Sequence, residues 1–257
     1  MDSIAEDYAK AMHQHFRILF ANWPPGQPLE LGDYGIVKGS MFMRMGNISE
    51  FKIPFTTRVD QTKDPMHFES SGSVKVVFKA KGSATAGGLM NTKAGFQINF
   101  SNKKATFFNA AKCAVNSIES KAVLGKVILR LKDEGKWDKQ HAIITEIVTA
   151  GSTTIIISKE KSASISIEAK SDSVKTIDLA DASIGLNSTS EEGIGFNTIA
   201  KDGLQPLIGL CQIQGWTETF QPKIQSSFEM VGTSKSGKAF EVEKFPIEEV
   251  EYFGRLL

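Results

Sequence analysis

Apolar and polar residues alternate most regularly in residues 73–81 and 163–170. A period of two places alternate side chains on opposite faces of a β-strand. Both segments are therefore predicted to be half-buried strands, with serine, lysine and glutamate on the polar face. The apolar members are Val74, Val76, Phe78 and Ala80 in the first segment, and Ala163, Ile165 and Ile167 in the second.

Each of these strands has a predicted partner. After a Gly/Ala/Ser/Thr-rich segment at 82–93, the chain returns through Phe96, Ile98 and Phe100, which alternate with polar residues and lead on to residue 108. Residues 141–157 are rich in Ile, Val and Thr, and a polar turn at 159–161 separates them from the strand at 163–170. The pattern predicts two long hairpins, 73–81 with 96–108 and 141–157 with 163–170.

Two segments have helical periodicity instead. In residues 3–22, Ile4, Tyr8, Met12, Phe16 and Leu19 recur at steps of three and four, and the proline pair that comes next ends the predicted helix. A helix packed on a sheet is expected there, with a membrane-surface or partner-binding helix as the alternative. Residues 110–137 repeat the spacing beside several lysine and arginine residues, which predicts a basic middle helix.

Shorter elements complete the expected fold. Glycines divide residues 29–55 into small strands joined by tight turns, and further short strands are expected at 183–186, 193–199 and 206–213. The fold class predicted from all of these elements is α+β. It comprises a twisted, mostly antiparallel sheet with long hairpins, an N-terminal helix and one or more packed helices.

The length and the end of the chain suggest a domain with an appendage. A chain of 257 residues with 41% hydrophobic content can bury one large core, which is assigned to residues 1–231. Residues 240–257 are too few to fold alone, so their apolar side chains must dock as a final structural element or as a detachable plug. The candidates for this inhibitory contact are Phe245, Ile247, Tyr252 and Phe253.

The segment between them, residues 232–239, reads GTSKSGKA and is close to a phosphate-binding loop. Ala239 occupies the position where that motif needs a serine or threonine for magnesium, and the sequence after it is extended rather than helical in pattern. An exposed turn or linker, open to proteases, is the favoured interpretation. The candidate cleavage residues are Gly232, Ser234, Lys235, Gly237 and Lys238.

Composition excludes several classes. Thirty basic and 29 acidic residues give a net charge of +1, which argues against a dedicated nucleic-acid binder. The acidic N-terminus lacks an apolar core, and no apolar run reaches about 18 residues, so neither a secretory signal nor a membrane helix is expected. Cys113 and Cys211 are expected to be ordinary thiols in a reducing compartment, with a disulfide or lipidation as alternatives. We expect a soluble, cytoplasmic protein.

No catalytic or cofactor motif is recognisable in the sequence. A Gly-x-Ser-x-Gly nucleophile elbow is absent, and His13, His15, His67 and His141 have no metal-ligand spacing. Acidic pairs such as residues 191–192 and 248–249 lie in polar surroundings typical of solvated charges. The sequence therefore predicts a protein that is not an enzyme and needs no cofactor.

The order of the elements resembles the pore-forming domain of gasdermins, in particular the compact bacterial type. The closest parallels are PLELGDYGIVKGSMFMRMGNI at residues 28–48 and KWDKQHAIITEIVTAGSTTIIISKEKSASISIEAK at 136–170. The second segment is similar to the family's sequence of a helix end, an apolar strand that contains an acid, and a returning alternating strand. The resemblance extends over most of the chain.

The resemblance implies a mechanism. A C-terminal segment holds the cytoplasmic domain inactive until a protease cuts the linker, after which copies oligomerise on a membrane and two hairpins per subunit insert to form a pore. Lysis or cell death results, including in antiviral defence. The apolar strand residues named above would face lipid. The candidate contacts to anionic headgroups are Lys75, Lys79, Lys103 and Lys104.

Two features depart from the family, and one alternative stays open. Bacterial gasdermins are commonly acylated on a cysteine next to the N-terminus, where this chain has none, and that role is not transferred to Cys113. The two arms of the second predicted hairpin also differ in length. The same alternation fits an ordinary sheet with one face in water, so a non-catalytic interaction or adaptor module is the alternative function.

Overall fold

A computed structural model describes residues 4–60, 62–82, 93–170, 179, 182–215 and 218–223. The chain divides into two units, Met1–Gln225 and Ser226–Leu257, and the second lies wholly outside the described residues. The predicted linker at 232–239 and the predicted tail at 240–257 therefore also lie outside them. All of the described helices and strands belong to the first unit.

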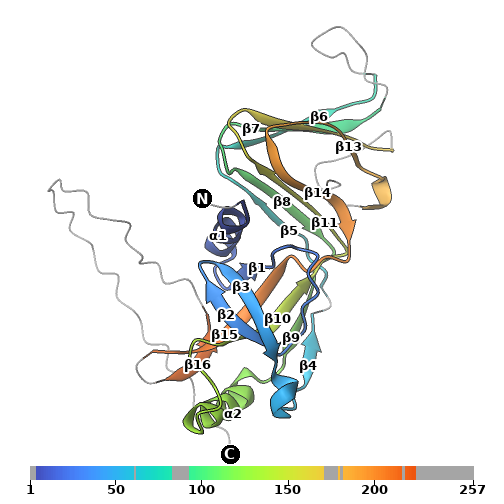
Figure 1. Ribbon diagram of the computed structural model, residues 1–257. Coiled ribbons are helices and arrows are strands. Elements are labelled where there is room, and N and C mark those ends of the chain that lie inside the picture. Colours follow the sequence, from blue (N-terminus) through green and yellow to red (C-terminus); the bar gives the residue numbers. More distant parts are fainter. Residues whose placement is uncertain are drawn as a thin grey trace, which may run out of the picture. The chain divides into compact units, whose positions relative to one another are not determined.

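The predicted α+β class is confirmed, with mostly antiparallel strands in three sheets and two α-helices, α1 (Ile4–Phe16) and α2 (Lys121–Asp133) (Figure 1). We call the sheets A, B and C. Sheet A contains β1 (Leu19–Ala21), β2 (Asp33–Lys38), β3 (Met41–Asn47), β4 (Thr57–Val59), β9 (Ala114–Ile118), β10 (Ala142–Thr149), β15 (Leu207–Gln214) and β16 (Thr219–Pro222). Sheet B contains β5 (Met66–Glu69), β8 (Thr106–Ala111), β11 (Ser152–Ser158) and β14 (Ile194–Asp202). Sheet C contains β6 (Val74–Lys79), β7 (Gly95–Phe100), β12 (Ala163–Glu168) and β13 (Asn187–Glu192).

Four chain segments pass through all three sheets in the same order. The order is β4-β9-β10-β15 in sheet A, β5-β8-β11-β14 in sheet B and β6-β7-β12-β13 in sheet C. Neighbours are antiparallel throughout. These four segments therefore form one four-stranded ribbon that runs through the three sheets, built from two long hairpins at 57–118 and 142–214.

The two central segments of this ribbon keep one register from end to end. Ser117 lies opposite Glu146 in sheet A, and Ala111 lies opposite Ser152 in sheet B. In sheet C, Phe100 lies opposite Ala163. Each step along one segment is matched by an equal step along the other, so no residue is gained or lost where one sheet gives way to the next.

The ribbon bends between sheets B and C, so that sheet C packs on sheet B. Phe96 and Ile98 of β7 and Ile165 of β12 are fully buried in one cluster with Phe107 of β8 and Ile156 of β11. Because β11 is covered on both faces, all seven of its residues are buried. At the other end, α2 packs on sheet A through Leu124 and Ile128.

The N-terminal helix is confirmed but is shorter than predicted. It ends at Phe16 because Arg17 adopts a left-handed conformation (φ 56°). Leu19, which the periodicity placed on the helix, instead begins β1 and pairs with Gly209 of β15. Sheet pairing therefore overrides the helical spacing at this end.

The predicted helix at 110–137 is wrong in its first third. Residues 106–111 form β8 and residues 114–118 form β9, which pairs with β4 on one side and β10 on the other. The helix begins only after Ser120, whose side chain accepts a hydrogen bond from the Val123 amide as an N-cap. The apolar residues in 110–118 matched a helical spacing by coincidence.

The predicted hairpins need correction as well. β6 and β7 pair as expected, but residues 106–108 belong to sheet B. The second hairpin is wrong, because β11 pairs with β8 and β14, whereas β12 pairs with β7 and β13. Consecutive strands lie in different sheets here because the turn between them bends the ribbon instead of reversing a strand within one sheet.

Most of the short strands are confirmed. β2 and β3 form the predicted pair within residues 29–55, and β14 and β15 match the strands expected at 193–199 and 206–213. The strand expected at 183–186 is a short 3-10 helix, η3 (Ala182–Ile184). β13 was not predicted because its sequence, NSTSEE, has no apolar residue and all six residues are exposed.

The packing of sheet C on sheet B gives a first prediction. We expect Ile165→Ala to lower the free energy of unfolding by about 2–5 kcal/mol, since it leaves a cavity between the two sheets. Urea unfolding followed by circular dichroism measures this change. Val123→Ala, at a side chain that is 61% exposed on α2, is the control and should change stability by less than about 0.5 kcal/mol. Equal losses in the two variants would contradict this assignment of the core.

Candidate functional site

The bends of the ribbon are its most distinctive local feature. Residues 70–73, 101–105, 159–162 and 193 connect sheets B and C. Each connection contains one residue with positive φ, namely Gly72 (64°), Lys104 (67°), Ser162 (59°) and Gly193 (63°). Glycine adopts this conformation freely, but for a residue with a Cβ atom it costs about 1–2 kcal/mol. Lys104 and Ser162 therefore store strain in the bent form.

Short polar side chains join neighbouring bends. The Ser158 hydroxyl donates to the Asn102 carbonyl oxygen (2.7 Å) and accepts from the Ala105 amide (2.9 Å). The Asn102 amide donates to the Ser73 hydroxyl (2.7 Å). The first two hydrogen bonds satisfy backbone groups at the bend and the third joins two side chains, so the bend is held by local polar contacts.

The candidate membrane-facing residues gather on the inner face of sheet C, with two exceptions. Phe78 is 47% exposed, with its ring 6.0 Å from that of Phe96, and Ala80 comes after β6 and is exposed. The other candidates are buried or partly buried against sheet B: Val74, Val76, Phe96, Ile98, Phe100, Ala163, Ile165 and Ile167.

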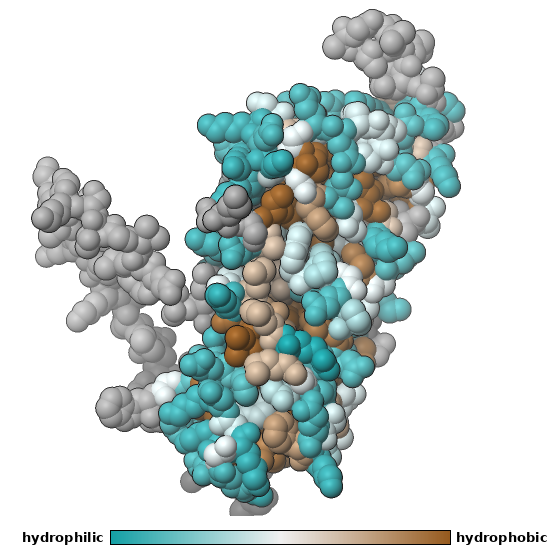
Figure 2. Space-filling view, viewed as in Figure 1, coloured by the Kyte–Doolittle hydropathy of each residue, from teal (hydrophilic) through white to brown (hydrophobic). Residues whose placement is uncertain are grey.

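The candidate headgroup lysines have different surroundings. Lys75 is exposed and lies opposite Asn99, on the polar outer face of sheet C, and Lys79 is partly buried at the end of the same strand. Lys103 is exposed in a bend. The Lys104 ammonium instead pairs with the Asp7 carboxylate of α1 (3.0 Å). Figure 2 shows hydrophilic residues over much of the visible surface, with smaller hydrophobic patches between them.

Helix α1 covers the face of sheet B that sheet C leaves open. Tyr8 and Met12 are fully buried in one cluster with Phe108 of β8 and with Ile155 and Ile157 of β11. The Asp7–Lys104 ion pair fixes the helix to the bend at 101–105. This one helix therefore shields a second apolar face of the ribbon from water.

The contact under α1 contains unsatisfied polar atoms. Thr106 lies opposite Ile157, and Thr153 lies opposite Ala110, so both threonines share the face that α1 covers. Their hydroxyls and the Tyr8 hydroxyl are buried without a hydrogen-bond partner among the described residues. Each such group costs about 1–3 kcal/mol. The helix is therefore held less firmly than its apolar area alone would allow.

His13 anchors the end of α1. Its imidazole stacks on Phe20 (ring centroids 3.8 Å apart), and its Nδ1 lies 2.8 Å from the Leu19 carbonyl oxygen, to which a protonated Nδ1 would donate. Burial lowers the pKa of this imidazole, the hydrogen bond to Leu19 opposes the shift, and the charge of Lys223 adds to it. Neutral His13 therefore suits the packed helix.

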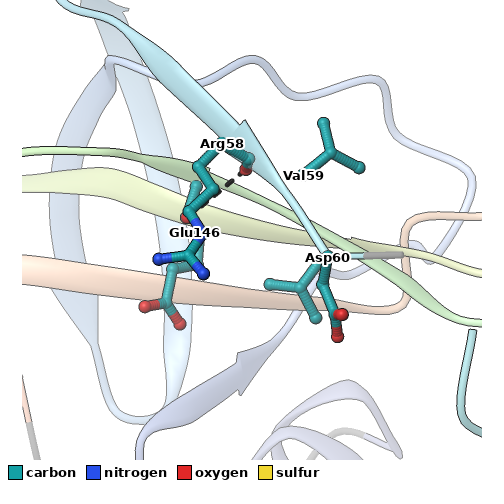
Figure 3. A pocket seen from close by; sticks show the side chains of 6 residues that line it. Arg58, Val59, Asp60 and Glu146 are labelled. Carbon is teal, nitrogen blue, oxygen red and sulfur yellow. Dashed lines mark hydrogen bonds between the residues drawn. The ribbon is translucent and has the colours of Figure 1, made fainter. Parts of the chain in front are cut away.

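An open hollow of about 600 Å³ lies beside sheet A (Figure 3). Arg58, Val59 and Asp60 line it from β4 and its end, and Glu146 lines it from β10. Figure 3 shows the Arg58 guanidinium on the same side of the strands as Glu146, and the Glu146 carboxylate pairs with Lys121 of α2. Val115 and Ser117 complete the lining, and its described residues include no histidine or cysteine to form a nucleophile–base pair.

The two thiols are free and buried. Burial raises the pKa of Cys113 to about 11 and also raises the pKa of Cys211, so both are protonated at neutral pH. Neither forms the disulfide that the sequence left open. Within the described part of the chain, no three metal-ligating side chains come together. None of the helices described there has the length and apolar composition of a membrane-spanning helix.

Sequence reasoning missed an aromatic cluster on sheet A. Tyr34, Phe51 and Trp137 come from three separate segments, with Tyr34 and Trp137 5.2 Å apart and Phe51 5.8 Å from each of them. The His141 ring lies 5.3 Å from both Tyr34 and Trp137. No local spacing in the sequence could reveal a cluster that only the β2–β10 pairing assembles.

No protein-family model matches the chain, and no curated protein matches its sequence significantly. The similarity to gasdermins therefore depends on the sequence segments named above and stays a prediction. Likewise, nothing in the described structure tests the candidate cleavage residues or the candidate inhibitory tail, because both lie outside the described residues.

The buried imidazole gives a pH prediction. Because the pKa of His13 is lower in the folded than in the unfolded chain, the unfolded chain binds the proton first as the pH falls below about 6.5. The stability that neutral His13 contributes is therefore complete above about pH 6.5 and is lost as the pH falls through the lowered value. Melting temperatures between pH 7.5 and 5 measure this loss.

The matched variants for this experiment are His13→Gln and His67→Gln. Glutamine at position 13 can still donate to Leu19 but does not titrate, so we expect a flatter pH profile. His67 has a side chain that is 47% exposed, and its replacement should leave the profile of the native chain. If both variants keep the native slope, acid sensitivity originates elsewhere.

Proposed function

We propose that this protein forms membrane pores through the two long hairpins of the ribbon, at 57–118 and 142–214. The observation that carries the proposal is the unbroken antiparallel register between the two central segments across sheets A, B and C. Two central segments that keep one register through all three sheets can extend without exchanging strand partners. Spanning strands need such complete pairing because lipid satisfies no backbone amide or carbonyl.

The positions of the apolar residues also favour extension. In a straight strand, every second residue lies on the same face. On the two central segments, the residues buried inside sheet C and those buried under α1 share one parity, so these segments would present them on one face if they were straight. From β7 to β8 these residues are Phe96, Ile98, Phe100, Phe108 and Ala110; from β11 to β12 they are Ile155, Ile157, Ala163, Ile165 and Ile167.

The extended face would not be uniform. Asn102 and Lys104 on one segment, and Lys159 and Lys161 on the other, interrupt it at the bend. Phe107 and Ile156 would move to the opposite, mostly polar face. A polar belt between two apolar zones places the bend near a headgroup region rather than in the lipid interior.

Strand length makes straightening necessary. The strands of sheet C have six residues each, whereas a membrane-spanning strand needs about 9–11. The segment from Gly95 to Ala111, in which β7 and β8 join, would extend about 56 Å at roughly 3.3 Å per residue. The described strands of sheet C therefore reach a spanning length only after they join those of sheet B.

The proposed pore forms only after proteolysis. A protease that cuts between residues 232 and 239 would remove the tail at 240–257, and the freed chain would assemble with further copies on an anionic membrane. Lys75 and Lys79 on sheet C, with Lys103 at the bend, supply positive charge for that surface. The site where the protein acts would then shift from the cytoplasm to the membrane, with lysis or cell death as the result.

A non-catalytic interaction module is the second candidate function. Met43 and Met45 on β3 are 50% and 58% exposed, and β3 is the last strand in the order of sheet A. Exposed methionines adapt to varied partners, and an edge strand can pair with another chain. This module would keep its partner whether or not the tail is removed, and it would leave membranes intact.

Membrane insertion can be tested residue by residue on β6. A protease site placed within 232–239 allows controlled cleavage, and single cysteines at 74 to 79 carry an environment-sensitive fluorophore. On anionic liposomes we expect dye release after cleavage. Labels at 74, 76 and 78 should become quenched by lipid-attached quenchers, while labels at 75, 77 and 79 should stay in water, because alternate residues face opposite sides.

Uncleaved protein is the control for both readouts. A cleaved, folded protein that leaves liposomes intact would exclude pore formation and favour the interaction module. Dye release without a period of two along β6 would show that the membrane is disturbed by a different part of the chain.

The strain at the bends gives a second test. Gly72 has φ 64° and open space around a Cβ atom, so Gly72→Ala strains only the backbone. Ser162→Gly removes the same strain from another bend. Positive φ costs a residue with a Cβ atom about 1 kcal/mol, and straightening the bend would relieve this cost. We therefore expect Gly72→Ala to speed dye release roughly fivefold and Ser162→Gly to slow it by a similar factor.

Gly39→Ala is the control, since Gly39 also has positive φ (63°) and open space but lies in the β2–β3 turn. This variant should lose comparable stability without faster release. If all three variants release dye at the native rate, the bends do not control insertion.

A further inference from the structure

The four-stranded ribbon has two open edges in sheets B and C. β5 and β6 form one edge, and β14 and β13 form the other. None of these strands has a partner on its outer side among the described residues. An open edge of this kind can pair with another chain unless charges or bulges prevent it.

The two edges of sheet C carry opposite charge. β6 has two lysines and no acid, whereas β13 has two glutamates and no base. Lys75, Glu191 and Glu192 are exposed, and Lys79 is partly buried. Like charges would repel if two copies met through the same edge, so the charges favour contact between unlike edges.

The charges are also matched in position. Lys75 lies opposite Asn99, Asn99 lies opposite Ser164, and Ser164 lies opposite Glu192. Lys75 and Glu192 therefore occupy the two ends of one row across the sheet. Directly opposed residues share a face, so both side chains belong to the polar outer face.

Strand direction permits the same contact. β6 runs antiparallel to β7, β7 to β12 and β12 to β13, so β6 and β13 run in opposite directions. A second copy that places its β6 beside β13 would continue the antiparallel alternation. The pairing is head to tail and leaves a free edge at each end, so it can repeat until a ring closes.

We propose that copies of this chain associate through β6 of one copy and β13 of the next, with Lys75 facing Glu192 across the contact. This inference rests on the proposed function, and it identifies the surfaces through which the pore would assemble. Surface charges of this kind contribute little in salt solution, which suits a contact that forms only when a membrane concentrates the copies.

Zero-length carbodiimide cross-linking tests the contact in the native sequence. The reagent joins an amine and a carboxylate only when they touch. Within one copy, Lys75 and Glu192 are separated by three strand spacings, about 14 Å, and so cannot be joined. On anionic liposomes, the chain cleaved within 232–239 should give a ladder of covalent oligomers, and mass spectrometry should find residue 75 linked to residue 192.

Charge exchange provides the matched variants. Lys75→Glu places a glutamate opposite Glu192 of the next copy, and Glu192→Lys places a lysine opposite Lys75, so each single variant should need roughly fivefold more protein for the same oligomer yield. The double variant in one chain, and an equal mixture of the two single variants, should both regain the native yield. If the charges of Lys75 and Glu192 served only to keep the open edges from pairing, each single variant would associate more than the native chain instead.

The outcomes separate this inference from the proposed function. Dye release without the 75–192 link, or without rescue by charge exchange, overturns the edge contact and leaves pore formation standing. The link and the rescue without dye release would support the contact and exclude pore formation. Absence of both link and release, in protein whose melting temperature is native, overturns both.

Discussion

The register between the two central segments of the ribbon is the constraint on which this structure depends. It fixes Ser117 against Glu146 in sheet A and Phe100 against Ala163 in sheet C, so three sheets act as one paired strip. Since a shift of one residue would turn every side chain to the opposite face, the register also decides which apolar residues sheet C and α1 must cover. The two covering layers are thus consequences of one pairing.

Sheet C and α1, the two layers that cover sheet B, differ in how well their buried groups are satisfied. Sheet C meets sheet B through a continuous apolar cluster, whereas α1 buries three hydroxyls that have no partner among the described residues. In water these hydroxyls would form hydrogen bonds, so their burial offsets part of the hydrophobic free energy that holds the helix on the sheet. A cover of this kind is more easily displaced than a typical core helix, and the Asp7–Lys104 ion pair compensates only in part.

The fold class was predictable from sequence because alternation at 74–79 and 163–168 is local, and so was the start of α1. Which strands pair with each other was harder to predict from the sequence. β11 is apolar or buried at every position since both of its faces are covered, and β13 has no apolar residue at all, so neither has the period of two. The inner face of sheet C could be named in advance, but the rows that bring Lys75 and Glu192 to opposite edges are set only by the register.

The complete burial of β11 has a consequence for how the molecule opens. Its amides lie between two ladders under two covers, so they should exchange with solvent only on global unfolding, whereas the bends and the edge strands exchange through smaller openings. Straightening at the bends would keep the β8–β11 ladder intact, while it would break the turn contacts and separate the packed apolar faces of sheets B and C. The strand that is most protected in the resting protein would then keep its ladder with β8 in the opened form, while the segments on either side of the bend change position around it.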